Sequence, residues 1–256
     1  MSIPKIIHYC WFGRNPKPQL AEKCIRSWQK FCPDYEILEW NEDNFDVSTA
    51  PKYVRQAYES KRWAFVSDYV RLRALTEMGG IYMDTDVEVV KSLEPYRKHQ
   101  AFAGFEHLER VQTGLLACEK GFPLFQEFLA YYDTASFLQP DGTPDVTTNV
   151  EVLTRLCRKY GLQFNDKFQV VQGVAIYPRE VFCPVDFDTE KLHRTRKTVT
   201  IHWFSGSWHT EEELEILRRE KQWKKQEKYS NIRYTIGKTL FGEKGYEKIK
   251  SLLKQH

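Results

Sequence analysis

The sequence predicts an α/β fold in which helices cover both faces of a mostly parallel central sheet. Strand-like and helix-like segments alternate from the N-terminus, and this order favours parallel strands joined by crossover helices. A chain of 256 residues, 41% of them hydrophobic and 14% aromatic, can bury a sizeable core. Polar residues also follow the expected strands, at the edge where ligands bind in sheets of this kind.

The elements can be justified in chain order. A strand is expected at residues 5–9, a helix at 19–31, a strand at 35–40 and a helix at 52–60. A longer helix is expected at residues 63–78, because apolar residues recur at spacings of three and four and Gly79 suits the left-handed residue that ends a helix. Residues 81–83 then have the character of a short buried strand. Further strands are expected at residues 101–105, 111–117 and 198–201, and further helices at 124–132 and 150–160.

The C-terminal part differs from the rest, so we expect one domain at residues 1–210 and a basic helical extension at 211–256. The extension holds 12 Lys or Arg and 8 Asp or Glu, a net charge of +4, whereas the whole chain carries +3. One interpretation is peripheral attachment to an anionic inner membrane leaflet. The alternative is a helical pair that packs on the domain and leaves its lysines in solvent.

The remaining composition excludes several classes of protein. No apolar run reaches the eighteen or so residues that a membrane span requires, and the N-terminus enters a strand pattern directly, so a cytoplasmic protein is expected. The six cysteines show no CxxC pair and are expected to be free thiols. No nucleic-acid partner is expected.

A group of polar residues lies in a core-like background between residues 63 and 86. Asp68 and Arg71 are three apart on the expected helix and share a face. Tyr82, Asp84 and Asp86 alternate along the following strand and also share a face. Carboxylates beside a core are costly unless they are paired or coordinate a cation. Two of them at the end of a strand suit a hard divalent ion that itself binds phosphates.

Simpler interpretations exist for each part of this group. Asp-x-Asp occurs in many surface turns, and an isolated Asp68–Arg71 helix pair contributes only about 0.2–0.5 kcal/mol. A calcium loop of the EF-hand type is excluded, because Val89 stands at the sixth position from Asp84, where glycine is required. The combination at fixed spacing is much more specific than any one part.

The combined pattern resembles a known family of enzymes. Ser67-Asp68-x-x-Arg71 followed by Gly79-Gly80-x-Tyr82-x-Asp84-x-Asp86 is similar to the sugar-binding region of the DXD-containing glycosyltransferases of family 32. That family includes bacterial capsule and lipopolysaccharide transferases and the yeast initiating mannosyltransferase, and its sugar-binding region is similar to that of the large clostridial glucosylating toxins. Residues 3–13 resemble the family's first strand and nucleotide loop, and residues 201–203 with Ser207 and Trp208 resemble its closing motif.

The resemblance implies a fold and a role for each motif residue. The implied fold is the GT-A nucleotide-diphosphosugar transferase fold, with the catalytic domain at residues 1–210. The nucleotide sugar is expected to contact Trp11 (base stacking), Asp68 and Arg71 (donor sugar), Tyr82 (ribose or base), Asp84 (hydroxyls), and Ser207 and Trp208 (leaving diphosphate). Trp11 has a core tryptophan as its alternative, and His8 is better explained as a core histidine.

A metal ion is expected beside these residues. Asp86 is expected to ligate Mn²⁺ or Mg²⁺ directly, and His202 is the further protein ligand expected, with a structural histidine as the alternative. An imidazole ligand would shift the preference toward Mn²⁺. Asp84, Asp86 and Arg71 are the expected catalytic residues, because the metal and the guanidinium face the charge that develops on the leaving group.

The predicted activity is metal-dependent transfer of a hexose from a nucleotide-diphosphate sugar to a saccharide acceptor in surface polysaccharide synthesis, and the resemblance implies retention of configuration. A UDP-hexose such as UDP-galactose, UDP-glucose or UDP-N-acetylglucosamine is the first choice of donor, and GDP-mannose is the second. The acceptor, which can be lipid-linked, is not identified by the sequence. Glu106 is considered for contact with it, although a surface glutamate is the simpler interpretation.

Two other functions remain open. The segment from Ile81 to Val87 also resembles the first motif of haloacid-dehalogenase-type phosphatases, in which the first aspartate, here Asp84, is a nucleophile. That motif normally opens its domain, whereas about eighty residues precede it here. The other alternative is a non-catalytic nucleotide-sugar-binding protein with the same fold.

Overall fold

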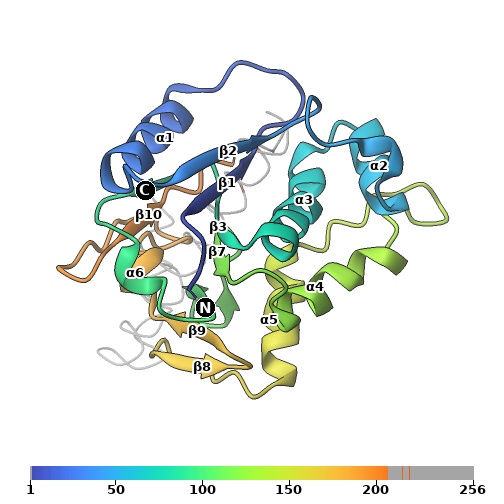
Figure 1. Ribbon diagram of the computed structural model, residues 1–256. Helices are drawn as coiled ribbons and strands as arrows, with labels where there is room; N and C mark the ends of the chain where they lie inside the picture. Colours follow the sequence, from blue (N-terminus) through green and yellow to red (C-terminus); the bar gives the residue numbers. More distant parts are fainter. Residues whose placement is uncertain (1, 207–214, 216–218, 220–256) are drawn as a thin grey trace, which may run out of the picture. The chain divides into compact units, whose positions relative to one another are not determined.

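The computed structural model describes residues 2–206 and, beyond them, residues 215 and 219 (Figure 1). The chain divides into two units, residues 1–205 and residues 206–256. The predicted boundary at residue 210, and the basic extension that follows it, lie outside the described residues and stay predictions. In the described part, no helix is both long enough and apolar enough to cross a bilayer.

One large sheet forms the centre of the first unit. Its strand order is β2 (Glu36–Trp40), β1 (Ile6–Cys10), β3 (Gly80–Met83), β7 (Leu115–Cys118), β5 (Ala101–His107), β9 (Val174–Tyr177) and β8 (Gln169–Val171), with β6 (Arg110–Val111) paired to β5. β1 is parallel to β2 and β3, and β5 is parallel to β9, whereas β7 and β8 are antiparallel to their neighbours. The predicted α/β architecture is therefore confirmed, but the sheet is mixed rather than mostly parallel.

The mixed character comes from a hairpin-like connection in the middle of the sheet. Residues 111–117, predicted as one strand, are divided between β6 and β7, which both run antiparallel to β5, and residues 112–114 interrupt the strand beside the polar group described below. Because β7 returns antiparallel between β3 and β5, its N-terminal end lies at the carboxyl edge of β3.

A second, two-stranded sheet carries the closing motif. β4 (Val87–Val89) pairs antiparallel with β10 (Thr200–His202), and Val87 lies opposite His202. This pairing brings residues near position 202 against those near position 86, which no local sequence pattern requires.

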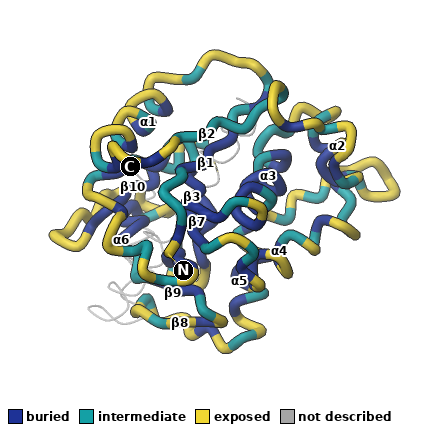
Figure 2. The backbone as a smooth tube through the Cα atoms, in the orientation of Figure 1, coloured by how far each residue is buried: buried dark blue, intermediate teal, exposed yellow. Residues whose placement is uncertain are grey.

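Helices cover both faces of the central sheet (Figure 1). One face carries α1 (Gln19–Phe31) and α6 (Arg179–Phe182), and the other carries α2 (Lys52–Glu59), α3 (Trp63–Met78), α4 (Pro123–Thr134) and α5 (Asn149–Lys159). Two short 3₁₀ helices span Val47–Thr49 and Glu94–Tyr96. The central strands are buried on both faces, whereas the outer faces of the helices and most loops are exposed (Figure 2).

The alternation expected after the double glycine is present in β3 but ends at Met83, because residues 85–86 form a turn before β4, so the prediction that Asp84 and Asp86 continue the strand is wrong. Ile81 and Met83 belong to the core cluster beneath α1, whereas Tyr82 belongs to the cluster beneath α3. Gly79 ends α3 at φ 70°, and a Cβ there would lie 2.7 Å from the backbone nitrogen of Lys120, so glycine is required at this turn. All six cysteines are free and buried, as predicted.

Candidate functional site

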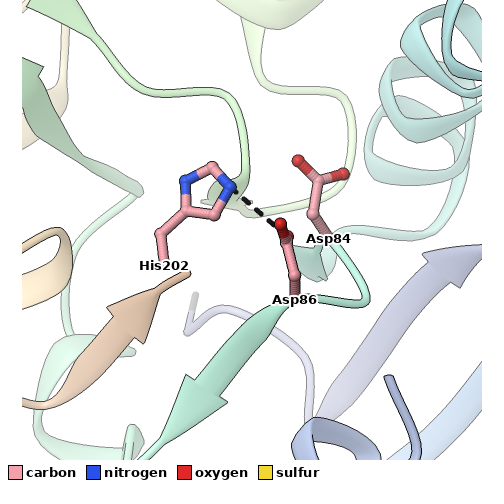
Figure 3. A group of neighbouring side chains, drawn as sticks. All are labelled: Asp84, Asp86 and His202. Carbon is pink, nitrogen blue, oxygen red and sulfur yellow. Dashed lines mark ion pairs between the residues drawn. The ribbon is translucent and has the colours of Figure 1, made fainter. Parts of the chain in front are cut away.

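Two carboxylates and an imidazole meet where β3, β4 and β10 come together (Figure 3). Asp84 directly follows β3, Asp86 directly precedes β4, and His202 ends β10. One possible ligand atom from each of the three side chains lies within 4.8 Å of the other two. The predicted juxtaposition of Asp86 and His202 is therefore present in the structure, and Asp84 lies beside them.

Asp86 and His202 form a buried ion pair. His202 Nε2 lies 3.3 Å from Asp86 Oδ1, and the backbone N–H of Ser205 donates to Asp86 Oδ2 at 2.8 Å. Burial disfavours the Asp86 carboxylate, but His202 and Ser205 more than offset this and hold its pKa well below the usual range. Burial likewise disfavours the imidazolium, but Asp86 raises the pKa of His202 well above its ordinary value.

The donor set fits a divalent transition metal. Two carboxylates and an imidazole are the ligands that Mn²⁺ or a similar ion accepts. Nε2 faces Asp86, while the buried Nδ1 of His202 has no hydrogen-bond partner of normal geometry in the described structure. The buried thiol of Cys183 interacts with the same ring. Nε2 is therefore the nitrogen available to an ion shared with Asp86.

A second buried pair, Arg71 with Asp68, adjoins this cluster. The Arg71 guanidinium lies 2.9 Å from Asp68 Oδ1 and 3.3 Å from Asp84 Oδ1. It also donates to the carbonyl oxygen of Thr113 at 2.9 Å. Burial raises the pKa of Asp68 to about 7, although the guanidinium of Arg71 opposes the shift. Arg71 thus links the predicted sugar-binding pair to the predicted metal cluster.

Tyr82 lies behind Asp84. Its hydroxyl donates to Asp84 Oδ1 at 2.8 Å, and the Arg71 guanidinium carbon lies 4.5 Å from the centroid of its ring. The side chain is only 1% exposed, so in this structure it positions the carboxylate and the guanidinium rather than presenting its ring to a ligand. Its contact with a ribose or base stays a prediction.

Trp11 lies at the same edge of the sheet, because it follows β1 and β1 pairs with β3. Its indole N–H donates to the carbonyl oxygen of Asn15 at 2.7 Å, and the ammonium of Lys17 lies 5.8 Å from its ring centroid. The ring is partly exposed, which is compatible with stacking on a base. That role stays a prediction.

His8 is a core histidine, as predicted. It is fully buried, its Nε2 lies 2.8 Å from the carbonyl oxygen of Gly79, and its Nδ1 accepts the indole N–H of Trp40 at 3.2 Å. Burial lowers its pKa. Both nitrogens are therefore satisfied in the neutral ring.

Three other residues are considered for the site: Ser207, Trp208 and Glu106. Ser207 and Trp208 lie outside the described residues. Glu106 is partly buried and interacts electrostatically with His202 and Asp84 of the metal cluster, so the interpretation as a surface glutamate is wrong.

Sequence reasoning missed two residues that shape the site. Gly114 leaves no room for a side chain, because a Cβ there would lie 2.9 Å from His202 Cε1 and 3.0 Å from Asp84 Oδ2. Asn149, at the start of α5, accepts the Thr113 hydroxyl and gives its backbone N–H to Asp68. Neither carried a motif, although a glycine inside a predicted strand is a signal of close approach.

Two carboxylates and a histidine beside a buried Arg–Asp pair, at the carboxyl edge of an α/β sheet, form a candidate site for a divalent metal ion. Residues 18–103 match the family described as "Glycosyltransferase sugar-binding region containing DXD motif". The chain therefore carries this glycosyltransferase region, and the predicted resemblance is confirmed. The match includes Asp68, Arg71 and the DXD aspartates, but ends before His202 and begins after Trp11.

A curated relative supports the same class of protein. Inositol phosphoceramide mannosyltransferase 3 of Schizosaccharomyces pombe is 30% identical over 130 residues, which are 48% of this chain and 35% of the relative. The chain thus spans about a third of the length of that relative.

Solved glycosyltransferase structures superimpose on the chain with low TM-scores. The PaToxG glycosyltransferase superimposes with a TM-score of 0.46 at 19% identity, over 62% of this chain and 69% of the other. The galactosyltransferase LgtC, solved with donor and acceptor sugar analogues, superimposes with a TM-score of 0.41 at 15% identity, over 80% of this chain and 90% of the other.

Proposed function

We propose that the protein is a metal-dependent glycosyltransferase that moves a hexosyl group from a nucleotide-diphosphate sugar to a saccharide acceptor. The observation that carries the proposal is the Asp84, Asp86 and His202 cluster, whose ligand atoms lie within 4.8 Å of one another beside the Arg71–Asp68 pair. The matched DXD region supports the same assignment.

Asp86 and His202 Nε2 are the residues proposed to hold the ion, with Mn²⁺ favoured over Mg²⁺ because of the imidazole. The bound ion supplies Lewis-acid stabilisation to the diphosphate. Arg71 is already oriented by Asp68, Asp84 and Thr113, so it can present its charge to a phosphate or sugar oxygen with little reorganisation. Asp84, fixed by Tyr82 and Arg71, is placed to accept sugar hydroxyls.

The proposed reaction exchanges one bond for another. The acceptor oxygen forms a bond to the anomeric carbon while the bond from that carbon to the diphosphate oxygen breaks. The electron pair leaves on the diphosphate, which takes the proton of the acceptor hydroxyl. We propose retention of configuration, and the described site residues are assigned to binding and charge stabilisation rather than to a covalent intermediate.

A UDP-hexose such as UDP-galactose is the proposed donor, with Trp11 stacking on the uracil. The mannosyltransferase named above makes GDP-mannose the second candidate. Both donors present a diphosphate to the same ion, so the site geometry serves either.

The proposed acceptor is a saccharide of a surface polysaccharide such as a capsule, and a lipid-linked form is included. A cytoplasmic site of action is proposed, with peripheral contact to the inner membrane through residues 211–256. Flotation of the chain on anionic vesicles, with and without residues 230–256, tests that contact.

The two alternative functions make different predictions. A phosphatase that uses Asp84 as a nucleophile would hydrolyse phosphate esters, lose this activity in Asp84→Asn and bind no nucleotide sugar. The matched DXD region does not favour this alternative. A non-catalytic binding protein would bind a nucleotide sugar without consuming it.

A thermal-shift screen of nucleotide sugars with and without Mn²⁺ tests the proposal. We expect one nucleotide-diphosphate sugar to raise the melting temperature only when Mn²⁺ is present, and Asp86→Ala to abolish the effect. The proposal fails if no nucleotide sugar stabilises the protein, or if the stabilisation survives Asp86→Ala unchanged.

A further inference from the structure

Glu106 occupies an irregular position at the end of β5. The pairing of β5 with β6 changes register between Phe105 and His107, so Glu106 is the extra residue of a β-bulge. Bulges occur beside active sites, where they turn a side chain away from the direction that regular alternation would give it. Glu106 interacts electrostatically with His202 and Asp84 of the metal cluster, and also with Arg110. The bulge therefore lies beside the metal cluster.

The Glu106 carboxylate has no hydrogen bond or ion pair with any residue that the structure describes. Burial raises its pKa, and the attractions to His202 and Arg110 do not reverse the shift. A partly buried carboxylate without donors is costly. A ligand that brings hydroxyl donors would remove this cost.

Gln112 gives a second, independent observation on the same part of the fold. It is fully buried, and neither its Oε1 nor its Nε2 has a hydrogen-bond partner among the described residues. Its backbone N–H donates to the carbonyl oxygen of Gly104, and its Nε2 lies over that glycine, 2.9 Å from where a Cβ would stand. Gly104 precedes Glu106 by two residues, so the amide that lacks a partner among the described residues lies over the part of β5 that leads into the Glu106 bulge.

Aromatic rings lie next to these polar groups. The Phe204 ring stacks on His202 with a centroid distance of 4.1 Å, and the Phe187 ring lies 5.3 Å from Phe204. Phe187 is 44% exposed, and its neighbour Asp188 lies 3.9 Å from His107, the residue after Glu106. The segment around Phe187 therefore borders the Glu106 bulge. Apolar rings with a few unpaired polar groups are typical of a small-molecule site.

The position of this group relative to the metal cluster indicates which substrate it contacts. Asp68 and Arg71 approach Asp84 from α3, on one face of the sheet. Phe182, which packs over Gly104, belongs to the core cluster of the α1 and α6 face, and His202 ends β10, which contacts α6. The donor sugar is assigned to Asp68 and Arg71, so the Glu106 side is left for the other substrate.

We propose that Glu106 and Gln112, bordered by the Phe187 and Phe204 rings, form the acceptor subsite and bind hydroxyl groups of an uncharged saccharide. The inference rests on the proposed transferase function. Glu106 accepts hydrogen bonds from the acceptor hydroxyls, and the Gln112 amide both donates and accepts. An anionic acceptor is disfavoured, because it would add a further negative charge beside Glu106, Asp84 and Asp86. Glu106 binds the acceptor, and takes no proton in the transfer step.

The test separates the two halves of the reaction. Three proteins are compared: wild type, Glu106→Gln and Glu109→Gln. Each is incubated with Mn²⁺ and the nucleotide sugar that stabilises wild type. The first incubation contains no acceptor other than water, and the second contains a panel of methyl glucosides, galactosides, mannosides and N-acetylglucosaminides. Glu109 is the matched control, because it is an exposed glutamate in the same hairpin. Slow hydrolysis of the donor reports the donor half, and transfer to a methyl glycoside reports the acceptor half.

We expect Glu106→Gln to keep donor affinity and hydrolysis near the wild-type values and to lose transfer by about tenfold or more through a higher KM for the glycoside. Glu109→Gln should match wild type in both assays. Gln112→Leu should also lose transfer, while its melting temperature stays unchanged or rises, because it removes a buried amide that has no partner. A purely structural role for Gln112 predicts the opposite change in melting temperature.

The outcomes that overturn the proposal are distinct from failure of the transferase itself. The subsite is refuted if Glu106→Gln lowers hydrolysis as much as transfer, if it changes neither, or if no methyl glycoside accelerates donor consumption by a wild type that hydrolyses the donor. If wild type neither binds nor hydrolyses any nucleotide sugar, the proposed function fails first, and the subsite fails with it.

Discussion

His202 Nε2 lies 3.3 Å from Asp86 Oδ1, and the pairing of β10 with β4 holds the two side chains there. Each group stabilises the charged form of the other, so the metal-free site contains an imidazolium opposite a carboxylate. A metal ion that binds Nε2 must displace that proton. Metal binding and protonation therefore compete for the same nitrogen.

The first prediction is that Mn²⁺ affinity rises with pH. The raised pKa of His202 means that its proton stabilises the fold fully below about pH 6.5, the ordinary histidine value, and that this stabilisation is lost as the pH rises through the folded-state value. Below that value, the Mn²⁺ affinity should increase about tenfold per pH unit, with release of about one proton. Calorimetric titrations in buffers of different ionisation enthalpy measure both quantities.

His202→Ala provides the control for this prediction, since it should weaken Mn²⁺ binding and flatten the pH dependence. An unchanged slope in this variant would show that another group releases the proton and that His202 is not a ligand.

The second prediction concerns Arg71, which lies between the buried carboxylate of Asp68 and the partly exposed carboxylate of Asp84. Arg71→Ala leaves Asp68 without its cation, and removal of one partner from a buried pair costs about 3–5 kcal/mol of unfolding free energy. Asp68 can relieve this cost by taking a proton. The destabilisation should therefore be smaller at pH 5 than at pH 8. Denaturant unfolding at the two pH values measures it.

Arg73→Ala is the matched control on the same helix. Arg73 pairs with Glu77 at 2.9 Å on the exposed surface, so its loss should cost about 1 kcal/mol or less at either pH. Equal costs for the two variants would contradict the central position given to Arg71.

The third prediction tests the space beside the metal cluster. Gly114→Ala places a methyl group against His202 and Asp84, and the backbone cannot retreat easily because the Gly114 carbonyl accepts the Asp84 N–H at 2.8 Å. We expect Mn²⁺ affinity to fall by roughly 10–100-fold, as for other changes that disturb metal ligands. Manganese titration followed by electron paramagnetic resonance measures the loss.

Gly142→Ala separates this effect from general strain. A Cβ at Gly142 would meet no atom within 4 Å, but the residue adopts φ 83°, so alanine there should lower the melting temperature and leave Mn²⁺ affinity unchanged. A similar loss of Mn²⁺ affinity in both variants would refute the close-contact argument.

The donor side of the site could be predicted from sequence because its residues are local. Asp68 and Arg71 share a helix face, which periodicity places together. Asp84 and Asp86 are two residues apart at the end of a strand, so they stay close although a turn, and not the strand alternation, connects them. The position of His202 required the motif resemblance, because only the pairing of β10 with β4 brings it to Asp86.

The antiparallel β7 and the Glu106 bulge could not be predicted in the same way. The segment from Val111 to Cys118 is typical of one strand. Gly114 signals a close approach, but it does not show that the strand is interrupted from Gln112 to Gly114. The direction of Glu106 depends on a register shift between two strands, which is a property of their pairing and not of either sequence alone.

The fourth prediction concerns Trp11 and the nucleobase. Trp11 is partly exposed at the end of β1, and its indole makes one exposed hydrogen bond, to the carbonyl oxygen of Asn15. Removal of the ring should therefore cost little stability. If the ring stacks on the base, Trp11→Ala should weaken binding of UDP by about 1–3 kcal/mol, whereas Trp11→Phe should keep part of the affinity. Calorimetric titration of UDP with Mn²⁺ measures both.

Trp40→Phe is the control, because Trp40 lies beside Trp11 on the neighbouring strand and is also partly buried. Its loss leaves the buried Nδ1 of His8 unpaired, which should cost about 1–3 kcal/mol of stability without changing UDP affinity. The two variants should therefore differ: Trp11→Ala should weaken UDP binding, and Trp40→Phe should lower stability. If Trp11→Ala unfolds the protein, or leaves UDP affinity intact, Trp11 belongs to the core and the base binds elsewhere.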